Sequence, residues 1–375
     1  MLIGIDASRA VLRQRTGTEN YSLYLIRALL DLGSEHRFRL YFNQAPAPDL
    51  FAASEQVEQR VMPCSRLWTH LCLAYETALH PPDVLYVPSH VLPLMHPRRC
   101  VVTIHDLGYL YYAQAHTRFQ RWYLDWSTRF NSRAARRIIA DSQATSTDLQ
   151  RLYHVAGSKI VVAYPAGASG LQPVTNAVAL LDCQQRYRTG PQYVLYLGSI
   201  QPRKNLPTLI RSFGLAVREG TIAQSIRLVL AGKKGWLPED LEGIARDEGV
   251  SDRCVLTGYV PDADLAALLS GALAYVLPSY YEGFGLPVLE AMACGTPVIC
   301  SNVSSLPEVA GDAAVLVDPQ DVKGLAQSIA RVCGDLMLRQ NLRQRGLRRA
   351  AAFSWQACAI KVLDVLEAVG NTNVG

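Results

Sequence analysis

The chain has 375 residues, of which 49% are hydrophobic and 18% charged, and its formal net charge is +5. This composition excludes a disordered protein, the length favours two domains, and so mild a charge gives no reason to expect nucleic acid as a partner. No apolar run approaches the roughly 18 residues of a membrane-spanning helix, the start lacks a signal-peptide pattern, and nine cysteines without a CxxC pair fit a reducing cytoplasm.

The first part of the chain alternates short apolar runs with helical patterns, which predicts a parallel sheet with helices on both faces. LIGIDAS is the first strand, and after a polar turn containing Gly17 a helical pattern ends at Gly33. RFRLYFN, DVLYVPS and CVVTIHD are further strands. The last of them places His105 and Asp106 just past a strand's carboxyl end, where α/β proteins bind ligands. His105 either bonds a ligand hydroxyl there or only caps local backbone.

Residues 116–140 read as a helix with two adjacent stripes, one basic and one aromatic. Six arginines accompany the single carboxylate of Asp125. One interpretation is a surface that meets anionic lipid headgroups or a charged acceptor. The other is an aromatic stripe in the core beside solvated arginines partly paired with Asp125. The stripes consist of Arg118, Arg121, Arg129, Arg133 and Arg136, and of Phe119, Tyr123, Trp126 and Phe130.

The second half restarts the strand–helix alternation at YVLYLGSIQPRKNLPTLIRSF. We expect a first domain over 1–170, a linker over 171–191 with scattered Gly and Pro, and a second domain over 192–353. Arg203 and Lys204 lie between a strand end and a helix start, where two cations can neutralise a diphosphate, although a bare RK pair is usually a solvated surface.

The pair Asp262 and Asp264 resembles a metal-binding DxD pattern, but it opens a helix directly after Pro261. We therefore expect Asp262 to cap that helix, and we expect no catalytic metal.

Residues 273–301 read as strand, Gly-rich loop, short helix and strand, with Pro287 at the helix start and Gly295 at its end. The N–H groups and partial positive charge of such a helix start suit a phosphate. Glu282 in the loop and Glu290 one turn into the helix either bind ligand hydroxyls or merely favour the helix start and face water.

The spacing of Glu282 and Glu290, with GFG and a proline between them, resembles the donor-site signature of retaining family 4 glycosyltransferases. The resemblance implies the GT-B fold, in which two Rossmann-like domains carry parallel sheets that face a central cleft. It also implies that a last helix, 354–370, crosses back to the first domain. The second domain would bind a nucleotide diphosphate sugar, and the first would bind the acceptor.

The resemblance further implies individual roles. Arg203 and Lys204 would neutralise the diphosphate, Glu282 would hold the transferred sugar, and Glu290 would hold the ribose. His105 would lie near the transferred carbon. The remaining expected donor contacts are Gly17, Thr18, Ser199 (where many members carry an arginine), Tyr259, Val260, Gly283, Phe284, Gly285 and Leu286.

The implied function is metal-independent, retaining transfer of a hexosyl group, with mannose the first guess, to a glycan or lipid-linked glycan in bacterial surface polysaccharide assembly. No cofactor is expected besides the nucleotide sugar, and the choice between GDP and UDP is open. A nucleotide-sugar 2-epimerase of the same architecture and a non-catalytic nucleotide-sugar-binding protein remain alternatives. We expect a cytoplasmic protein, and peripheral contact with the inner face of an anionic membrane through 116–140 is left open.

Overall fold

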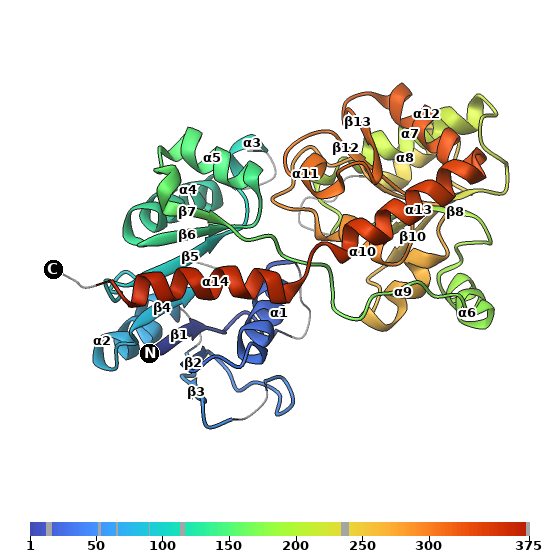
Figure 1. The fold of residues 1–375 in the computed structure, drawn as a ribbon. Helices are drawn as coiled ribbons and strands as arrows, with labels where there is room; N and C mark the ends of the chain where they lie inside the picture. Colours follow the sequence, from blue (N-terminus) through green and yellow to red (C-terminus); the bar gives the residue numbers. More distant parts are fainter. Residues whose placement is uncertain are drawn as a thin grey trace. The chain divides into compact units, whose positions relative to one another are not determined.

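The computed structural model describes residues 1–12, 17–51, 54–64, 67–89, 91–112, 117–233 and 240–372. The chain divides into two compact α/β units (Figure 1). The first comprises Met1–Leu110, His116–Ala166 and Ser354–Gly375, and the second comprises Tyr111–Ala115 and Gly167–Phe353. Within the described ranges, no helix is both long enough and apolar enough to cross a membrane.

The first unit is built on a seven-stranded parallel sheet with the order β3-β2-β1-β4-β5-β6-β7. The short apolar runs seen in the sequence form its central strands, as expected for a parallel sheet covered on both faces. The strands are β1 (Leu2–Asp6), β2 (Arg37–Phe42), β3 (Val57–Val61), β4 (Val84–Val87), β5 (Cys100–Ile104), β6 (Arg137–Ala140) and β7 (Ile160–Val162).

Successive residues of these strands point to opposite faces, and each face carries its own core. Tyr86, Val101 and Ile139 pack in the core shared with α1 (Gly17–Asp31) and α14 (Trp355–Gly370). Trp355 at the start of α14 lies 5.7 Å from the ring of Tyr21 on α1, so the last helix packs on the first unit as predicted. The other face is covered by η1 (Thr69–Leu73), α2 (Ala74–Leu79), α3 (Gly108–Tyr111), α4 (Arg118–Ala134) and α5 (Gln143–Tyr153).

The helical pattern over 116–140 overlaps at its carboxyl end with IIADS, which reads as a strand, and the structure has the strand. Helix α4 begins after the cap Thr117, whose side chain accepts from the Gln120 N–H, and it ends at Ala134. Arg137–Ala140 instead form β6, between β5 and β7. Pairing of buried, β-branched residues in the sheet outweighs the helical spacing of the arginines.

The second unit contains a six-stranded parallel sheet with the order β10-β9-β8-β11-β12-β13. Its strands are β8 (Tyr193–Leu197), β9 (Arg227–Ala231), β10 (Cys254–Gly258), β11 (Ala274–Leu277), β12 (Val298–Ser301) and β13 (Ala314–Val317). Its helices are α6 (Ala177–Tyr187), α7 (Leu206–Arg218), α8 (Leu241–Asp247), α9 (Asp262–Ser270), α10 (Leu286–Ala293), α11 (Leu306–Ala310), α12 (Val322–Gly334) and α13 (Leu336–Ala351).

Two sequence expectations for this unit differ from the structure. The range 171–191, expected to be a linker, contains helix α6, which packs against α9. The N-cap position of α9 is Pro261, and Asp262, expected at that position, is the first residue of the helix. Asp264 instead accepts from Arg186 at 2.7 Å and from the Tyr187 hydroxyl at 2.6 Å. The first turn of α9 therefore holds α6 in place through these two bonds. Sequence spacing alone does not reveal this contact.

A close approach of two turns shapes the carboxyl edge of this sheet. Gly232 has φ +147°, and a Cβ atom there would lie 1.8 Å from the Gly198 carbonyl oxygen. The Gly232 N–H donates to the Gly258 carbonyl at 2.8 Å, so the turns after β8, β9 and β10 are held together. Only glycine fits this position. The turn after β8 is also the one that carries Arg203 and Lys204.

Candidate active site

The main candidate site lies at the carboxyl edge of the second sheet, where the strand order reverses between β8 and β11. Ligands of open α/β sheets bind at such switch points. The turn after β8 leads through a short 3-10 helix, Pro202–Lys204, to α7, and the loop after β11 leads to α10. The fold therefore brings Arg203, Lys204 and Glu282 together, although 78 residues separate Lys204 from Glu282.

Glu282 is the centre of a buried ionic cluster. Its Oε1 accepts from Lys204 Nζ at 2.5 Å and from Ser279 Oγ at 2.6 Å, and its Oε2 accepts from Arg203 at 2.8 Å. The side chains of Glu282 and Lys204 are only 6% and 7% exposed. These contacts exclude the interpretation in which Glu282 merely faces water, because both of its oxygens accept hydrogen bonds from buried or half-buried protein groups.

Electrostatics explains why a charge is tolerated there. Burial alone raises the pKa of Glu282, but the charges of Arg203 and Lys204 and the hydrogen bonds outweigh it and lower the pKa to about 2. The carboxylate is therefore ionised at neutral pH. This carboxylate holds two cations where the loops after β8 and β11 meet, and its single negative charge does not neutralise both.

Residues that the sequence interpretation missed hold the loop in place. The Ser305 hydroxyl donates to the carbonyls of Glu282 at 2.9 Å and Phe284 at 2.7 Å, and the Glu282 N–H donates to Ser304 Oγ at 3.0 Å. Asn205, at φ +58°, donates to the carbonyls of Pro278 and Pro319. The motif SSLPE was visible in the sequence, but nothing local indicates which carbonyls its serines contact.

Helix α10 begins with Gly285 as N-cap at φ +104°, where a Cβ would lie 2.7 Å from Leu306. Pro287 lies in its first turn, as predicted, and the helix ends before Gly295. Glu290 lies one turn along, and its Oε1 accepts from the Ala168 N–H at 3.3 Å. Burial raises the pKa of Glu290 to about 7. The protein therefore lowers the pKa of Glu282 and raises the pKa of Glu290. The sequence motif that contains both residues does not predict this difference.

The other expected donor contacts lie on the turns of this same sheet edge. Ser199 follows Gly198 after β8, and its carbonyl accepts from the Tyr196 hydroxyl at 2.8 Å. Tyr259 and Val260 follow β10, Tyr259 half exposed and Val260 buried. The stretch Gly283, Phe284, Gly285 and Leu286 leads from Glu282 into α10.

The first unit contributes a separate polar pair. His105 follows β5 and Asp141 follows β6, so the carboxyl ends of adjacent strands bring them together. His105 Nδ1 lies 2.6 Å from Asp141 Oδ2, and the His105 ring packs edge-on against Tyr21 at 4.7 Å. Burial opposes charge on His105, but Asp141 raises the pKa of the imidazole above its ordinary value. His105 Nε2 is buried and has no hydrogen-bond partner among the described residues, and the backbone of Pro88 also favours the charged ring by raising its pKa.

Gly17 and Thr18 are the first residues of α1, in the first unit. The Thr18 carbonyl accepts from Ser22 within that helix. Their expected approach to the donor phosphate depends on the placement of the two units and stays a prediction.

Comparisons with known proteins agree along the whole chain. The model for glycosyl transferases group 1 matches residues 182–349, and the model for Glycosyltransferase Family 4 matches residues 15–166. The O-antigen chain mannosyltransferase B of Escherichia coli is 32% identical over 96% of this chain and 98% of its own length. The serotype-specific mannosyltransferase WbdA of Escherichia coli is 31% identical over 69% of this chain, which is 32% of that longer protein.

Solved structures match the fold over nearly the full length. A sucrose-phosphate synthase of Thermosynechococcus elongatus has a TM-score of 0.75, at 23% identity over 98% of both chains. HepE of Anabaena, solved in complex with UDP-glucose, has a TM-score of 0.74, at 17% identity over 98% of this chain and 99% of its own. Two Rossmann-like units, the two matching family models and a full-length relative at 32% identity agree with one another. The chain therefore belongs to glycosyltransferase family 4, with the GT-B fold.

Proposed function

We propose that the protein is a mannosyltransferase that moves mannose, with retention of configuration, from a nucleotide diphosphate donor to a glycan or lipid-linked glycan of a bacterial surface polysaccharide. The observation that carries the donor site is the convergence of Lys204, Arg203 and Glu282 beside the first turn of α10. The choice of mannose and of a surface glycan is supported by the relative of 32% identity, an O-antigen chain mannosyltransferase. GDP and UDP both remain candidates for the nucleotide.

The cations of this site can stabilise negative charge on the leaving group. When the bond from the sugar to the diphosphate breaks, negative charge grows on the phosphate oxygens. Lys204 and Arg203 are held in position by Glu282 before any donor arrives, so little reorganisation is needed. The N–H groups from Phe284 to Leu286 add the partial positive charge of a helix start. We assign these groups to binding the diphosphate and to stabilising it as it leaves.

Glu282 and Glu290 are assigned to the two sugars of the donor. Glu282 uses both oxygens on Lys204, Ser279 and Arg203, and a carboxylate with about four acceptor positions keeps one on Oε2 for a sugar hydroxyl. Glu290 keeps its Oε2 for the ribose, while Oε1 accepts from Ala168. Burial raises the pKa of Glu290 to about 7. Near neutral pH its carboxyl group can therefore donate a hydrogen bond to a ribose hydroxyl or accept one from it.

His105 is assigned to the transferred sugar from the first unit. Its Nδ1 is occupied by Asp141, so Nε2 is the atom that meets a ligand. The raised pKa keeps a positive charge or a donated hydrogen bond at that atom. Gly17 and Thr18 complete the proposed donor contacts. No side chain is assigned as a covalent nucleophile, so the leaving phosphate is the base proposed to take the acceptor's proton.

A lipid surface is proposed as a further partner of the first unit. Phe119 and Trp122, in the first turns of α4, are 71% and 61% exposed, and Arg118 and Arg121 flank them. On the neighbouring η1–α2 segment, Leu71, Tyr75 and Leu79 are also exposed, at four-residue spacing. Exposed aromatic and aliphatic side chains among arginines are the composition of a peripheral contact with anionic lipid. Such a contact would bring the enzyme close to a lipid-linked acceptor. Vesicles with anionic lipid should sediment the chain, and the double variant Phe119→Ser, Trp122→Ser should not sediment.

One incubation separates the proposed function from its alternatives. The protein is given GDP-mannose, UDP-glucose or UDP-N-acetylglucosamine, with and without a mannose-containing acceptor, and the sugar products are analysed. A lengthened acceptor supports transfer, and its anomeric configuration tests retention. A donor epimerised at C2 would replace the proposal with an epimerase. Binding of a donor without either product would leave a nucleotide-sugar-binding protein.

A further inference from the structure

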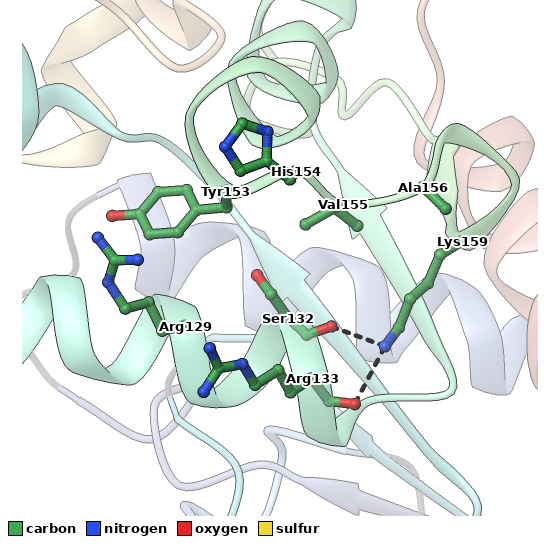
Figure 2. A pocket seen from close by; sticks show the side chains of 8 residues that line it. All are labelled: Arg129, Ser132, Arg133, Tyr153, His154, Val155, Ala156 and Lys159. Carbon is green, nitrogen blue, oxygen red and sulfur yellow. Dashed lines mark hydrogen bonds between the residues drawn. The ribbon is translucent and has the colours of Figure 1, made fainter.

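A cationic cavity lies in the first unit, away from the residues assigned to catalysis. Figure 2 shows it between the carboxyl end of α4 and the segment that joins α5 to β7. Its volume is about 340 Å³, which is enough for a small phosphorylated compound. The lining residues are Arg129, Ser132, Arg133, Tyr153, His154, Val155, Ala156 and Lys159.

The cavity and the polar pair of His105 and Asp141 lie at opposite edges of the same sheet. Lys159 directly precedes β7 and Arg133 precedes β6, whereas Asp141 follows β6. The four residues of β6 separate the two edges by roughly 13 Å. The cavity is therefore a second place at which a ligand can bind, and the roles proposed above do not use it.

The charges around the cavity are not balanced. Arg129 pairs with Asp125 at 2.9 Å and stacks over the ring of Tyr153 at 5.2 Å. The Arg133 guanidinium is exposed and has no ion pair or hydrogen bond within the described part of the chain. None of the described residues lining the cavity is acidic. The site therefore holds more positive charge than its protein partners neutralise.

Lys159 adds to this excess from the floor of the cavity. Its ammonium donates to the carbonyls of Ser132 at 2.6 Å and Arg133 at 3.1 Å, which fixes it at the end of α4 (Figure 2). Burial, together with the nearby Arg136 and Arg137, lowers the pKa of Lys159. The Ser132 hydroxyl is buried and lacks a hydrogen-bond partner among the described residues. An anion in the cavity would supply both the missing charge and an acceptor.

We propose that this cavity binds a phosphate monoester or diester, with the guanidinium of Arg133 and the ammonium of Lys159 as its main cationic contacts. Guanidinium groups bind phosphate oxygens through paired N–H donors, and a serine hydroxyl donates a further bond. A soluble phosphorylated metabolite and a lipid headgroup both supply this chemistry. The proposal stands apart from the donor site, because all its residues lie in the first unit.

The test is calorimetric titration of the full chain with inorganic phosphate and with glycerol 1-phosphate, beside sedimentation with phosphatidylcholine vesicles that contain or lack phosphatidylglycerol. Arg133→Gln is the cavity variant. Arg211→Gln is the matched control, because it removes an exposed arginine from helix α7 of the second unit. Equal melting temperatures of both variants and the parent establish that the fold is intact. Lys159→Gln is the second variant, and glycosyl transfer measured alongside reports on the donor site separately.

Binding with a Kd below about 1 mM, weakened at least tenfold in Arg133→Gln and less than twofold in Arg211→Gln, supports the site. Soluble ligands that show this difference identify a metabolite, and vesicles that show it identify a lipid headgroup. Equal losses in the two variants, or no binding to either kind of probe, overturns the proposal. Glycosyl transfer should be unchanged in Arg133→Gln, because the cavity is not part of the donor site. The binding assay therefore tests the cavity proposal, and the transfer assay tests the proposed function separately.

Discussion

Lys204 and Glu282 form a buried ion pair, with Nζ 2.5 Å from Oε1, between two loops that adjacent parallel strands deliver to the same sheet edge. Arg203 completes the cluster on the other oxygen of the carboxylate. Glu282 therefore has two roles. It stabilises the fold by pairing with buried or half-buried cations, and it keeps these cations charged and oriented for the proposed chemistry.

Replacing Lys204 with Met should reduce turnover about 100-fold or more, because a cation aimed at the leaving diphosphate is worth several kcal/mol in the transition state. Steady-state transfer at saturating donor is the measurement. Lys323→Met removes an exposed lysine of the same unit and should leave turnover unchanged. Near-normal turnover in Lys204→Met, with an intact circular dichroism spectrum, would show that Lys204 does not serve the leaving group.

Glu282→Gln should lower the free energy of unfolding by about 3 kcal/mol at pH 7, because it leaves two buried or half-buried cations without their partner. The pKa of Glu282 is lowered from 4.5 to about 2, so its stabilising contribution is present above pH 4.5 and is lost as the pH falls toward 2. Urea unfolding from pH 7 down to pH 3 measures this. The difference between parent and variant should shrink with acid, whereas exposed Glu219→Gln should show little difference at any pH.

Glu290→Gln should have the opposite pH dependence. Burial raises the pKa of Glu290 from 4.5 to about 7, so the folded state favours its neutral form, and ionisation above pH 7 costs up to about 3 kcal/mol. The variant should therefore match the parent below pH 4.5 and melt at a higher temperature than the parent at pH 8. A melting temperature that is unchanged or lower at pH 8 contradicts this environment. Glu242→Gln, an exposed carboxylate, serves as the control.

Asp141→Asn should lower the pKa of His105, because it removes the negative charge 2.6 Å from Nδ1. His105, with a raised folded pKa, contributes stability that is full below pH 6.5 and is lost as the pH rises through that folded value. The variant should lose this contribution and about tenfold in turnover, with the pH optimum moved to lower pH. The imidazole titration is followed by NMR. An unmoved titration and pH profile would leave Asp141 a purely structural residue, and Asp49→Asn is the exposed control.

Gly232→Ala should unfold or severely destabilise the second unit, because the new Cβ would lie 1.8 Å from the Gly198 carbonyl oxygen. Gly220→Ala is the matched control. It also has positive φ, +66°, but nothing lies within 4 Å of its added Cβ, so it should cost only about 1 kcal/mol. Chemical unfolding of both variants measures the difference. Equal costs would mean that the turns after β8 and β9 separate easily.

The sequence predicted much of this molecule because the relevant signals are local. Apolar runs indicated most of the strands, and Pro287 and Gly295 marked the start and the end of α10. Errors arose where tertiary contacts decide. The spacing of the arginines extended the expected helix to 140, whereas pairing with β5 and β7 places Arg137–Ala140 in β6.

The site shows the same limit. His105, Arg203, Lys204 and Glu282 were all identified as polar residues near strand ends. Their partners were not, since the pairing of His105 with Asp141 and of Lys204 with Glu282 depends on which strands are neighbours in the sheet. Strand order is a property of the whole sheet, and no motif of a few residues contains it.

The most direct test of the donor site is calorimetric titration of the parent and of Lys204→Met with GDP, GMP, UDP and UMP. For the preferred base, the parent should bind the diphosphate at least tenfold more tightly than the monophosphate, and Lys204→Met should lose most of that preference. A preference for the diphosphate that survives in Lys204→Met, or no preference in the parent, would contradict the assignment of the Lys204–Glu282 cluster to the donor's phosphates.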